Sequence, residues 1–303
     1  MIIRILGSAA GGGFPQLNCA CSNCAGVRAG KPGFTSRTQA SVAVSADGER
    51  WALLNASPDL RAQVAAFPAL QAKPERGHRN SPIGAVVLTN GDVDAVAGLL
   101  SLREGFTFDM LAAEPVLETL AANSIFNVLS PEAVTRRALP VDRPVPLIEG
   151  VTVEAFTVRG KTALYLETQA PDFGTRDGDT IGLEITDGRT GASFHFIPSC
   201  ARVDPRLRSR LEGAQLVLFD GTLYADDEMI WQGLSLKTGA RMGHLSMSGP
   251  DGSIAALASL GIARRIFVHI NNSNPVLDAH GPEHAAVRAA GWEIAHDGLE
   301  ITL

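Results

Sequence analysis

The order of strand-like and helical segments, which occurs twice along this chain, most limits what it can fold into. In each half, short apolar runs typical of buried strands alternate with runs whose apolar residues recur at helical spacing. Two mixed sheets packed face to face, with helices outside, satisfy that order. We therefore expect an α/β fold, a four-layer α/β/β/α sandwich, formed as a single domain by residues 1–303. The expected strands are 2–6, 40–45, 51–56, 84–89, 151–158, 181–186, 193–198, 216–220, 265–270 and one within 292–298.

The composition and charge of the chain exclude several classes of partner. Hydrophobic residues make up 45% of the sequence and charged residues 19%, which supplies ample apolar material for a core. The net charge of −6 argues against nucleic acid or an anionic membrane as a partner. The first residues lack the pattern of a secretory signal, and no run of about 18 apolar residues is present to span a bilayer. We expect a cytoplasmic protein.

Three of the four cysteines lie within six residues, in the segment CACSNC. Cys21 and Cys24 are separated by two residues, so both thiolates can face one ion, and Cys19 can provide a third corner of a tetrahedron. In a reducing compartment such a cluster favours metal binding over disulfides. The spacing predicts a structural Zn²⁺ site whose fourth ligand comes from elsewhere in the chain. Three reduced thiols without a metal, or a redox dithiol, are the alternatives.

A glycine-rich segment, GSAAGGG, leads from the first expected strand towards the cysteines. It lacks the Lys-Ser/Thr pair of a phosphate-binding loop, and its glycines are contiguous rather than spaced for a dinucleotide. We expect these glycines to let the backbone pass close to a functional site, or simply to relax the turn.

Several polar side chains follow expected strands at the point where each strand ends. Asp92 and Asp94 come after strand 84–89 in TNGDVDAVAGLL, and His269 lies at the end of strand 265–270. His244 lies in a loop before an expected helix, and Asp220 ends strand 216–220. Because α/β sheets collect ligands at one edge, we expect these groups to lie close together, with Asp220 orienting a histidine.

Other polar segments have ordinary structural explanations. Ser57 is a plausible N-cap for the helix in SPDLRAQVAAF. The acidic trio at 226–228 is expected to form the solvated start of a helix. The segment 170–179 is polar and rich in glycine, and we expect a surface loop there, either a lid or a plain connection.

The joint occurrence of several motifs points to a known family. These motifs are LGSAAGGGFPQLNCACSNC, LLNASPDLRAQ, GLLSLREG, LFDGTLYADDEM, RMGHLSMSGP and VHINNSNPVLD. Together they closely resemble the family of coenzyme PQQ (pyrroloquinoline quinone) biosynthesis protein B, over nearly the whole chain. That family belongs to the metallo-β-lactamase-like superfamily, so the resemblance implies the same four-layer sandwich as the order of segments.

The resemblance also implies which metal ligands this chain lacks. The superfamily signature Thr-His-x-His-x-Asp-His falls on residues 89–95, where Thr89 and Asp94 match and Asn90, Asp92 and Ala95 replace histidines. Gly160 and Ser199 fall where a further histidine and a bridging aspartate are expected. A two-zinc hydrolase needs a bridging carboxylate and several imidazoles to hold its hydroxide. We therefore reject β-lactamase and phosphodiesterase chemistry.

A one-metal reaction is what the resemblance implies instead. Similar proteins keep Asp-His where this chain has Asp94-Ala95, so that Asp94, that histidine and His269 form the facial triad of a non-haem Fe²⁺ oxygenase. The implied reaction is an iron- and dioxygen-dependent hydroxylation of the Glu–Tyr crosslinked precursor of PQQ. Ala95, which is either a natural departure or a deliberate replacement, predicts impaired activity, with Asp92 or water filling in for the missing ligand.

Further roles follow from the same resemblance. His244 would carry a proton or contact substrate, and Arg103, Asp220 and Asn271 would contact substrate. Similar proteins take their fourth zinc ligand from a histidine just after the last active-site histidine, a position that Asn272, an unusual zinc ligand, occupies here. His269 is the alternative zinc ligand, in which case it is unavailable to iron.

A second function of a different class stays open beside the oxygenase. The depleted ligand set also suits a carrier that binds PQQ or its precursor and assists transport. In both cases the expected partner is a small molecule, and a homo-oligomer is left open.

Overall fold

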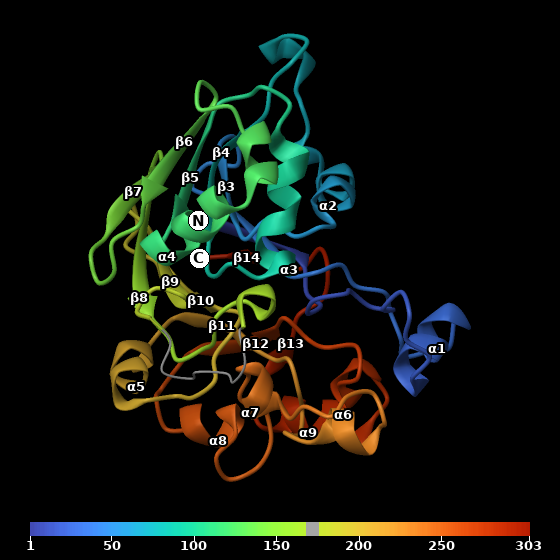
Figure 1. The fold of residues 1–303 in the computed structure, drawn as a ribbon. Helices are drawn as coiled ribbons and strands as arrows, with labels where there is room; N and C mark the ends of the chain where they lie inside the picture. The colour runs from blue at the N-terminus through green and yellow to red at the C-terminus, as the bar shows by residue number, and fades with distance from the viewer. Residues whose placement is uncertain (168–175) are drawn as a thin grey trace.

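The computed structural model describes residues 1–167 and 176–303, which fold into two seven-stranded sheets (Figure 1). The first sheet has the strand order β14-β1-β2-β3-β4-β5-β6. Its strands are β1 Ile2–Gly7, β2 Ser41–Ser45, β3 Trp51–Leu54, β4 Ile83–Leu88, β5 Phe108–Ala112, β6 Val134–Ala138 and β14 Glu300–Thr302. β3 to β6 pair in parallel, whereas β14, β1, β2 and β3 pair antiparallel.

The second sheet repeats this mixed pattern with the order β13-β12-β11-β10-β9-β8-β7. Its strands are β7 Val145–Ile148, β8 Val151–Thr157, β9 Ile181–Asp187, β10 Ser193–Ile197, β11 Leu216–Asp220, β12 Arg264–Val268 and β13 Glu293–Ile294. β10 to β13 pair in parallel. Parallel strands end at one edge, so the loops after β11 and β12 emerge side by side.

Helices cover the outer faces of the two sheets, and α1 lies to one side of both sheets (Figure 1). They are α1 Ser22–Arg28, α2 Leu60–Ala66, α3 Val93–Val96, α4 Glu114–Ala122, α5 Pro205–Leu211, α6 Glu228–Trp231, α7 Gly239–Met242, α8 Ser253–Leu257 and α9 Pro282–Ala289. Short 3₁₀ segments, η1 to η6, are Pro68–Leu70, Pro74–Arg76, Ala97–Leu102, Ser124–Val128, Leu164–Leu166 and Pro275–Leu277. α2, α3 and α4 lie over the first sheet, and α5, α8 and α9 lie over the second (Figure 1).

Three apolar layers explain why this arrangement is stable. Between the sheets, side chains such as Val87 of β4 and Phe196 of β10 form one buried cluster. On the outer face of the first sheet, Val86 packs with Leu120 of α4 in a second cluster. Phe267 packs with residues of α5, α8 and α9 in a third. Successive residues of β4 face opposite layers, so burial on both faces explains its uninterrupted apolar sequence. The predicted four-layer α/β/β/α sandwich is confirmed.

The structure differs from the sequence prediction at several elements. β5, β6, β7 and β14 were not predicted, and β6 has mostly exposed, polar side chains because it is an edge strand.

The helix expected around Asp94 is shorter than predicted: α3 ends after four residues, and the chain continues as the 3₁₀ segment η3. Gly98 explains the change, because its N–H donates to the Ala56 carbonyl at 2.8 Å and a Cβ there would lie 2.2 Å from the Ser57 carbonyl oxygen.

Two smaller expectations fall on the α2 region and on the segment 170–179. Ser57 is not the N-cap of α2: the helix begins at Leu60 after Asp59, and the Ser57 hydroxyl bonds Gln63 at 3.1 Å. Most of the expected loop at 170–179 lies outside the described residues. Among the helices at 1–167 and 176–303, none has the length and apolar character needed to cross a bilayer.

Candidate functional site

The loop after β4 is held at its start by a residue from the neighbouring strand. Asn55, which follows β3, accepts a hydrogen bond from the Thr89 N–H at 2.9 Å, and its amide nitrogen donates to the Thr89 hydroxyl at 3.0 Å. Asn55 adopts a left-handed backbone with φ of 62°, which asparagine tolerates better than most residues. These bonds fix where Asp92 and Asp94 enter the site. Asn55 was not predicted as a site residue, because no local motif distinguishes it.

Asp94 and His269 meet across the two sheets. The Nε2 atom of His269 lies 2.8 Å from Oδ2 of Asp94, and the two side chains are 13% and 17% exposed. His269 has a φ of 56°, an uncommon conformation for a residue with a side chain. Such a conformation costs about 1–3 kcal/mol and persists only where its surroundings hold it. Here contacts at both ring nitrogens hold the imidazole.

Thr222 lies at the centre of a hydrogen-bond network that orients both histidines. Its hydroxyl is 2.8 Å from Nδ1 of His269, 3.1 Å from Nδ1 of His244 and 2.7 Å from Oδ1 of Asp220. Nδ1 of His244 also lies 2.7 Å from Oδ2 of Asp220. A consistent proton assignment has both Nδ1–H groups donating and the Thr222 hydroxyl donating to Asp220. In that assignment, Nε2 of His244 remains available, whereas Nε2 of His269 faces Asp94.

This network explains the positions of Asp220, His244 and His269 without a metal among them. Their ligand atoms lie within 4.8 Å of one another, a spacing that also suits an ion. The Thr222 hydroxyl, however, occupies the space between them at hydrogen-bond distance from all three. Asp220 is fully buried and also accepts a hydrogen bond from the Cys200 N–H, which suits an orienting role rather than contact with substrate.

Asp92 is the second carboxylate of the site. Burial, followed by the nearby charge of Asp94, raises the pKa of Asp92, whereas Lys161 and His244 act in the opposite direction. Burial also disfavours the Asp94 carboxylate, but the hydrogen bond from His269 holds the pKa of Asp94 below its usual range. Burial disfavours the charged form of His269 in turn, yet Asp94 raises the pKa of that imidazole. Both shifts favour a protonated His269 paired with an Asp94 carboxylate.

The glycine-rich segment passes directly beside this pair. A Cβ at Gly11 would lie 3.7 Å from the Asp94 carboxyl group, so the absence of a side chain lets the backbone approach it. Gly12 and Gly13 have φ of 93° and 69°, which relaxes the turn there. Gly11 thus allows the close backbone approach that was expected, and Gly12 and Gly13 allow the expected turn.

The three-ligand iron site that the resemblance implies is incomplete in this chain. Asp94 and His269 provide one carboxylate and one imidazole, but Ala95 is 2% exposed and carries no ligand atom. Gly160 does not leave room for a compensating side chain, because a Cβ there would lie 2.5 Å from the Thr180 hydroxyl. The residues present do not fit a complete facial triad.

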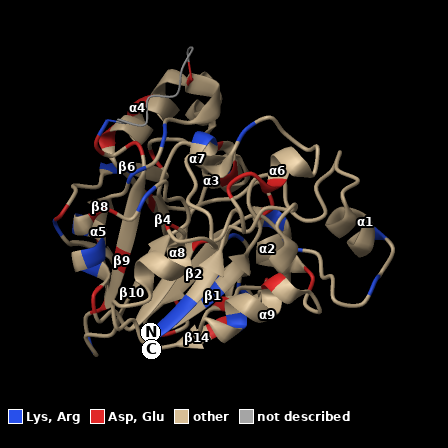
Figure 2. Cartoon of the chain, turned by 90° about the horizontal axis from the view of Figure 1, so that it is seen from below, with Lys and Arg blue, Asp and Glu red and all other residues tan. Residues whose placement is uncertain are grey.

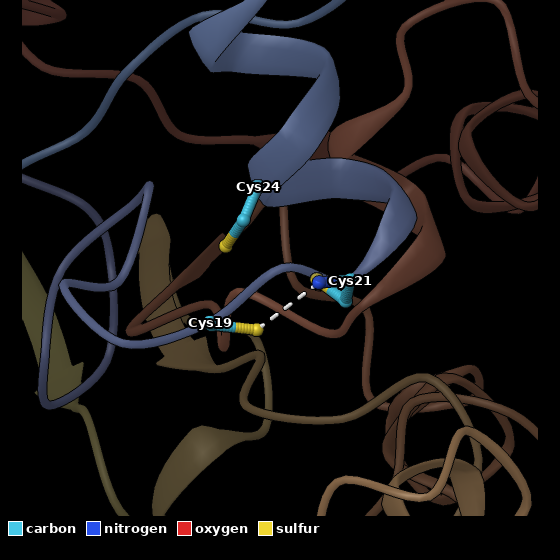
Figure 3. A group of neighbouring side chains, drawn as sticks. All are labelled: Cys19, Cys21 and Cys24. Carbon is cyan, nitrogen blue, oxygen red and sulfur yellow. Dashed lines mark hydrogen bonds between the residues drawn. The ribbon is translucent and has the colours of Figure 1, made fainter.

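The cysteines form a separate cluster on the N-terminal segment. Cys24 lies on α1 and Cys19 and Cys21 on the loop before it, with their sulfur atoms turned towards one another (Figure 3). Burial raises the pKa of the Cys24 thiol to about 11, and the nearby Cys21 acts in the same direction. Burial also acts on Cys21, but hydrogen bonds, first from the Cys24 backbone, hold the pKa of Cys21 below its usual value. The Cys21 thiol thus ionises more readily than an ordinary cysteine, beside the thiols of Cys19 and Cys24.

Asn272 directs its side chain into this cluster. Its Nδ2 atom lies 3.1 Å from Sγ of Cys19 and 3.4 Å from Sγ of Cys24. Rotating the amide places Oδ1 at the same point, so the residue can offer an oxygen as fourth ligand. Asn23 of α1 holds this loop by donating to the Asn272 carbonyl at 3.0 Å. Three thiols and one amide around one point fit a tetrahedral Zn²⁺, and the geometry places His269 with Asp94 instead.

The side chains of the other predicted substrate-binding residues, Arg103 and Asn271, form hydrogen bonds outside the two centres. Arg103 follows η3, is exposed, and donates to the Leu100 carbonyl at 2.7 Å. Asn271 bonds the Ser273 hydroxyl at 2.6 Å within its own loop. Glu228, expected in a solvated trio, is fully buried and accepts from Ser273 at 2.7 Å, so that expectation was wrong.

Comparison with known proteins agrees with this architecture. Residues 50–270 match the family model of the β-lactamase superfamily domain. The coenzyme PQQ synthesis protein B of Rhodopseudomonas palustris (strain BisB5) is 55% identical, and that of Xanthomonas euvesicatoria pv. vesicatoria (strain 85-10) is 53% identical, each over 100% of both chains. A crystal structure of Zn²⁺-bound PqqB from Methylobacterium extorquens superimposes with a TM-score of 0.97 at 49% identity, covering 100% of both chains.

A diphosphatase of the PhnP family, at 19% identity and a TM-score of 0.69, shares the fold alone. The family assignment therefore rests on the full-length relatives and on the match of residues 50–270. This chain belongs to the coenzyme PQQ synthesis protein B family of the β-lactamase superfamily.

Proposed function

We propose that this chain binds the Glu–Tyr crosslinked precursor of PQQ beside Asp92, Asp94 and His269, and that the reaction proper to this site is an iron- and dioxygen-dependent hydroxylation. The contact between Asp94 and His269, at 2.8 Å, carries the proposal. It joins a carboxylate and an imidazole, which are two of the three ligands of a facial triad. Thr222 orients the other nitrogen of that imidazole.

The chain's own residues would contribute binding, orientation and proton transfer. Asp220 holds Nδ1 of His244, so the Nε2 atom of that imidazole is free to exchange a proton with a bound molecule. A bound Fe²⁺ would supply the activation of dioxygen. Because Ala95 leaves the triad one imidazole short, we expect weak iron binding and slow turnover from the chain as it stands.

The cysteine cluster has a different proposed role, which is to hold a structural Zn²⁺. It ties the segment before α1 to the loop that follows His269, through Asn272. The zinc in the related protein from Methylobacterium extorquens supports zinc binding in this family. A metal bound there would fix the loop that positions His269.

Restoring the missing imidazole tests the proposed reaction. Ala95→His is expected to raise Fe²⁺ affinity by about 10-fold or more and to give iron-dependent oxygen consumption with the precursor. The double variant Ala95→His, Asp94→Asn is the matched control, because it keeps the new imidazole and removes the carboxylate. An Ala95→His protein that binds iron and leaves the precursor unchanged would contradict the hydroxylase assignment.

A carrier function is the second candidate, and the incomplete ligand set favours it. A carrier needs affinity for PQQ or its precursor but no metal-centred reaction. It predicts that the chain as it stands binds PQQ with the same affinity before and after Fe²⁺ is added. Calorimetric titration with PQQ, in buffer with and without Fe²⁺, separates the two functions.

A further inference from the structure

A cavity beyond the ends of β8 and β10 is lined by three arginines. Among the described residues, Arg159, Arg202 and Arg241 surround it together with Ala201 and Ala240, and its volume is about 560 Å³. That volume lies within the range of small-molecule sites, which is roughly 300–1,000 Å³. Figure 2 shows the basic residue of α7, the helix that contains Arg241. Three guanidinium groups around one cavity are unexpected in a chain of net charge −6.

Backbone contacts connect this cavity directly to the histidines of the site. The Cys200 N–H donates to Asp220, the carboxylate that orients His244, and the next residues along the chain are Ala201 and Arg202. The Ala201 N–H in turn donates to the Arg159 carbonyl. On the other wall, α7 carries Arg241 and leads within three residues to His244. The segment that carries Arg202 also adjoins the loop of His244, because the Leu245 N–H donates to the Cys200 carbonyl at 2.7 Å.

The charges around the cavity do not cancel. Glu167 pairs with Lys161 at 2.8 Å and with Arg241 at 3.5 Å, and Asp204 pairs with Arg159 at 3.6 Å. Within the residues that the structure describes, the Arg202 guanidinium has no hydrogen bond or ion pair. Among the described residues, four positive groups thus accompany two carboxylates, an excess of two positive charges that favours an anionic ligand. Guanidinium groups bind carboxylates in a bidentate manner.

We propose that Arg159, Arg202 and Arg241 form the carboxylate-recognition part of the substrate site, and that this part selects a polycarboxylate. This inference rests on the proposed function, which supplies the ligand. A molecule made by crosslinking a glutamate to a tyrosine carries two α-carboxylates and one side-chain carboxylate. Arg202 is the central residue because its guanidinium holds no carboxylate in the described part of the chain, whereas Arg159 and Arg241 each hold one.

The test is calorimetric titration of the full-length, zinc-loaded chain with the crosslinked precursor. Arg202→Ala is expected to weaken binding by about 10- to 100-fold, as for loss of a charged hydrogen bond, and Arg202→Lys to recover part of the loss. Arg79→Ala is the matched control. Arg79 is exposed, is unpaired within the described residues, and precedes β4, so it lies at the opposite edge of the sheet from Asp94. That variant should bind as tightly as the unchanged chain.

A second ligand separates charge recognition from shape. The trimethyl ester of the precursor, in which all three carboxylates are neutralised, should bind the unchanged chain weakly, and Arg202→Ala should not change its affinity further. Equal precursor affinity in Arg202→Ala, Arg241→Ala and the unchanged chain would overturn this site while leaving the proposed function standing. Loss of binding in Arg202→Ala, together with an iron-loaded Ala95→His protein that does not hydroxylate, would keep the site and overturn the hydroxylation.

Discussion

The Nε2 atom of His269 lies 2.8 Å from Oδ2 of Asp94, although 175 residues separate the two along the chain. The aspartate follows β4 of the first sheet and the histidine follows β12 of the second, so their contact closes the gap between the sheets at one edge. It also brings together a carboxylate and an imidazole whose orientations are already set by Thr222 and the turn at Thr89. The site is therefore preorganised without a metal.

The hydroxyl group of Thr222 is expected to stabilise this edge. Thr222→Val keeps the shape of the side chain but leaves Nδ1 of His269 and one oxygen of Asp220 without that partner. The free energy of unfolding should fall by about 1–3 kcal/mol, as for other buried polar groups left unpaired. Urea denaturation of the two proteins measures the difference. Thr222→Ser, which keeps the hydroxyl, should lose much less, and equal losses in both variants would contradict the role of the hydroxyl.

The cysteine cluster is expected to bind about one zinc ion per chain under reducing conditions. Cys24→Ser should lower the zinc content to near zero, because a hydroxyl group is a poor ligand beside the two remaining thiolates. Cys200→Ser serves as the control, since Cys200 is equally buried but outside the cluster. Elemental analysis of the purified proteins gives both contents. Full zinc occupancy in Cys24→Ser would rule out the cluster as the zinc site.

Asn272 is expected to set how tightly that zinc is held. Asn272→His supplies an imidazole, a stronger zinc ligand than an amide, so zinc should leave this variant about 10-fold more slowly in the presence of a chelator. Asn272→Ala should release zinc faster than the unchanged chain. A colour-forming chelator follows the release. Identical rates in all three proteins would show that the fourth ligand is not at position 272.

The buried carboxyl group of Glu228 predicts a pH dependence of stability. Burial raises the pKa of Glu228 to about 7 from its usual 4.5, so the folded protein holds this proton more tightly than the unfolded chain does. The stabilisation is complete below the unfolded pKa and is lost as the pH rises through about 7. The loss amounts to about 3 kcal/mol, taking 1.36 kcal/mol per pKa unit.

Glu228→Gln removes this titration while keeping the size of the side chain. Its free energy of unfolding should change less than that of the unchanged chain between about pH 5 and pH 8, where the Glu228 proton is lost. Urea denaturation at a series of pH values measures both slopes. Parallel curves for the two proteins would show that Glu228 is ionised throughout.

Local pattern was sufficient for much of the fold and for the chemistry of single residues. Apolar runs such as the one that became β4 identified the central strands, because a strand buried on both faces must be apolar throughout. The spacing of Cys21 and Cys24 likewise limits where their sulfur atoms can lie, whatever surrounds them. Edge strands such as β6 were missed because an exposed strand needs no apolar pattern.

The sequence by itself determined the two-sheet order of this protein, the clustering of its thiols and the absence of an imidazole at position 95. Only the tertiary structure decided that His269 faces Asp94 while Asn272 faces the cysteines, three residues further on. It also decided that Thr222 fills the space between two histidines, that Glu228 is buried, and that three arginines share one cavity. The physical reason is that side-chain direction at a strand end depends on one or two backbone torsions, such as the left-handed φ of His269, and these are set by contacts between distant segments.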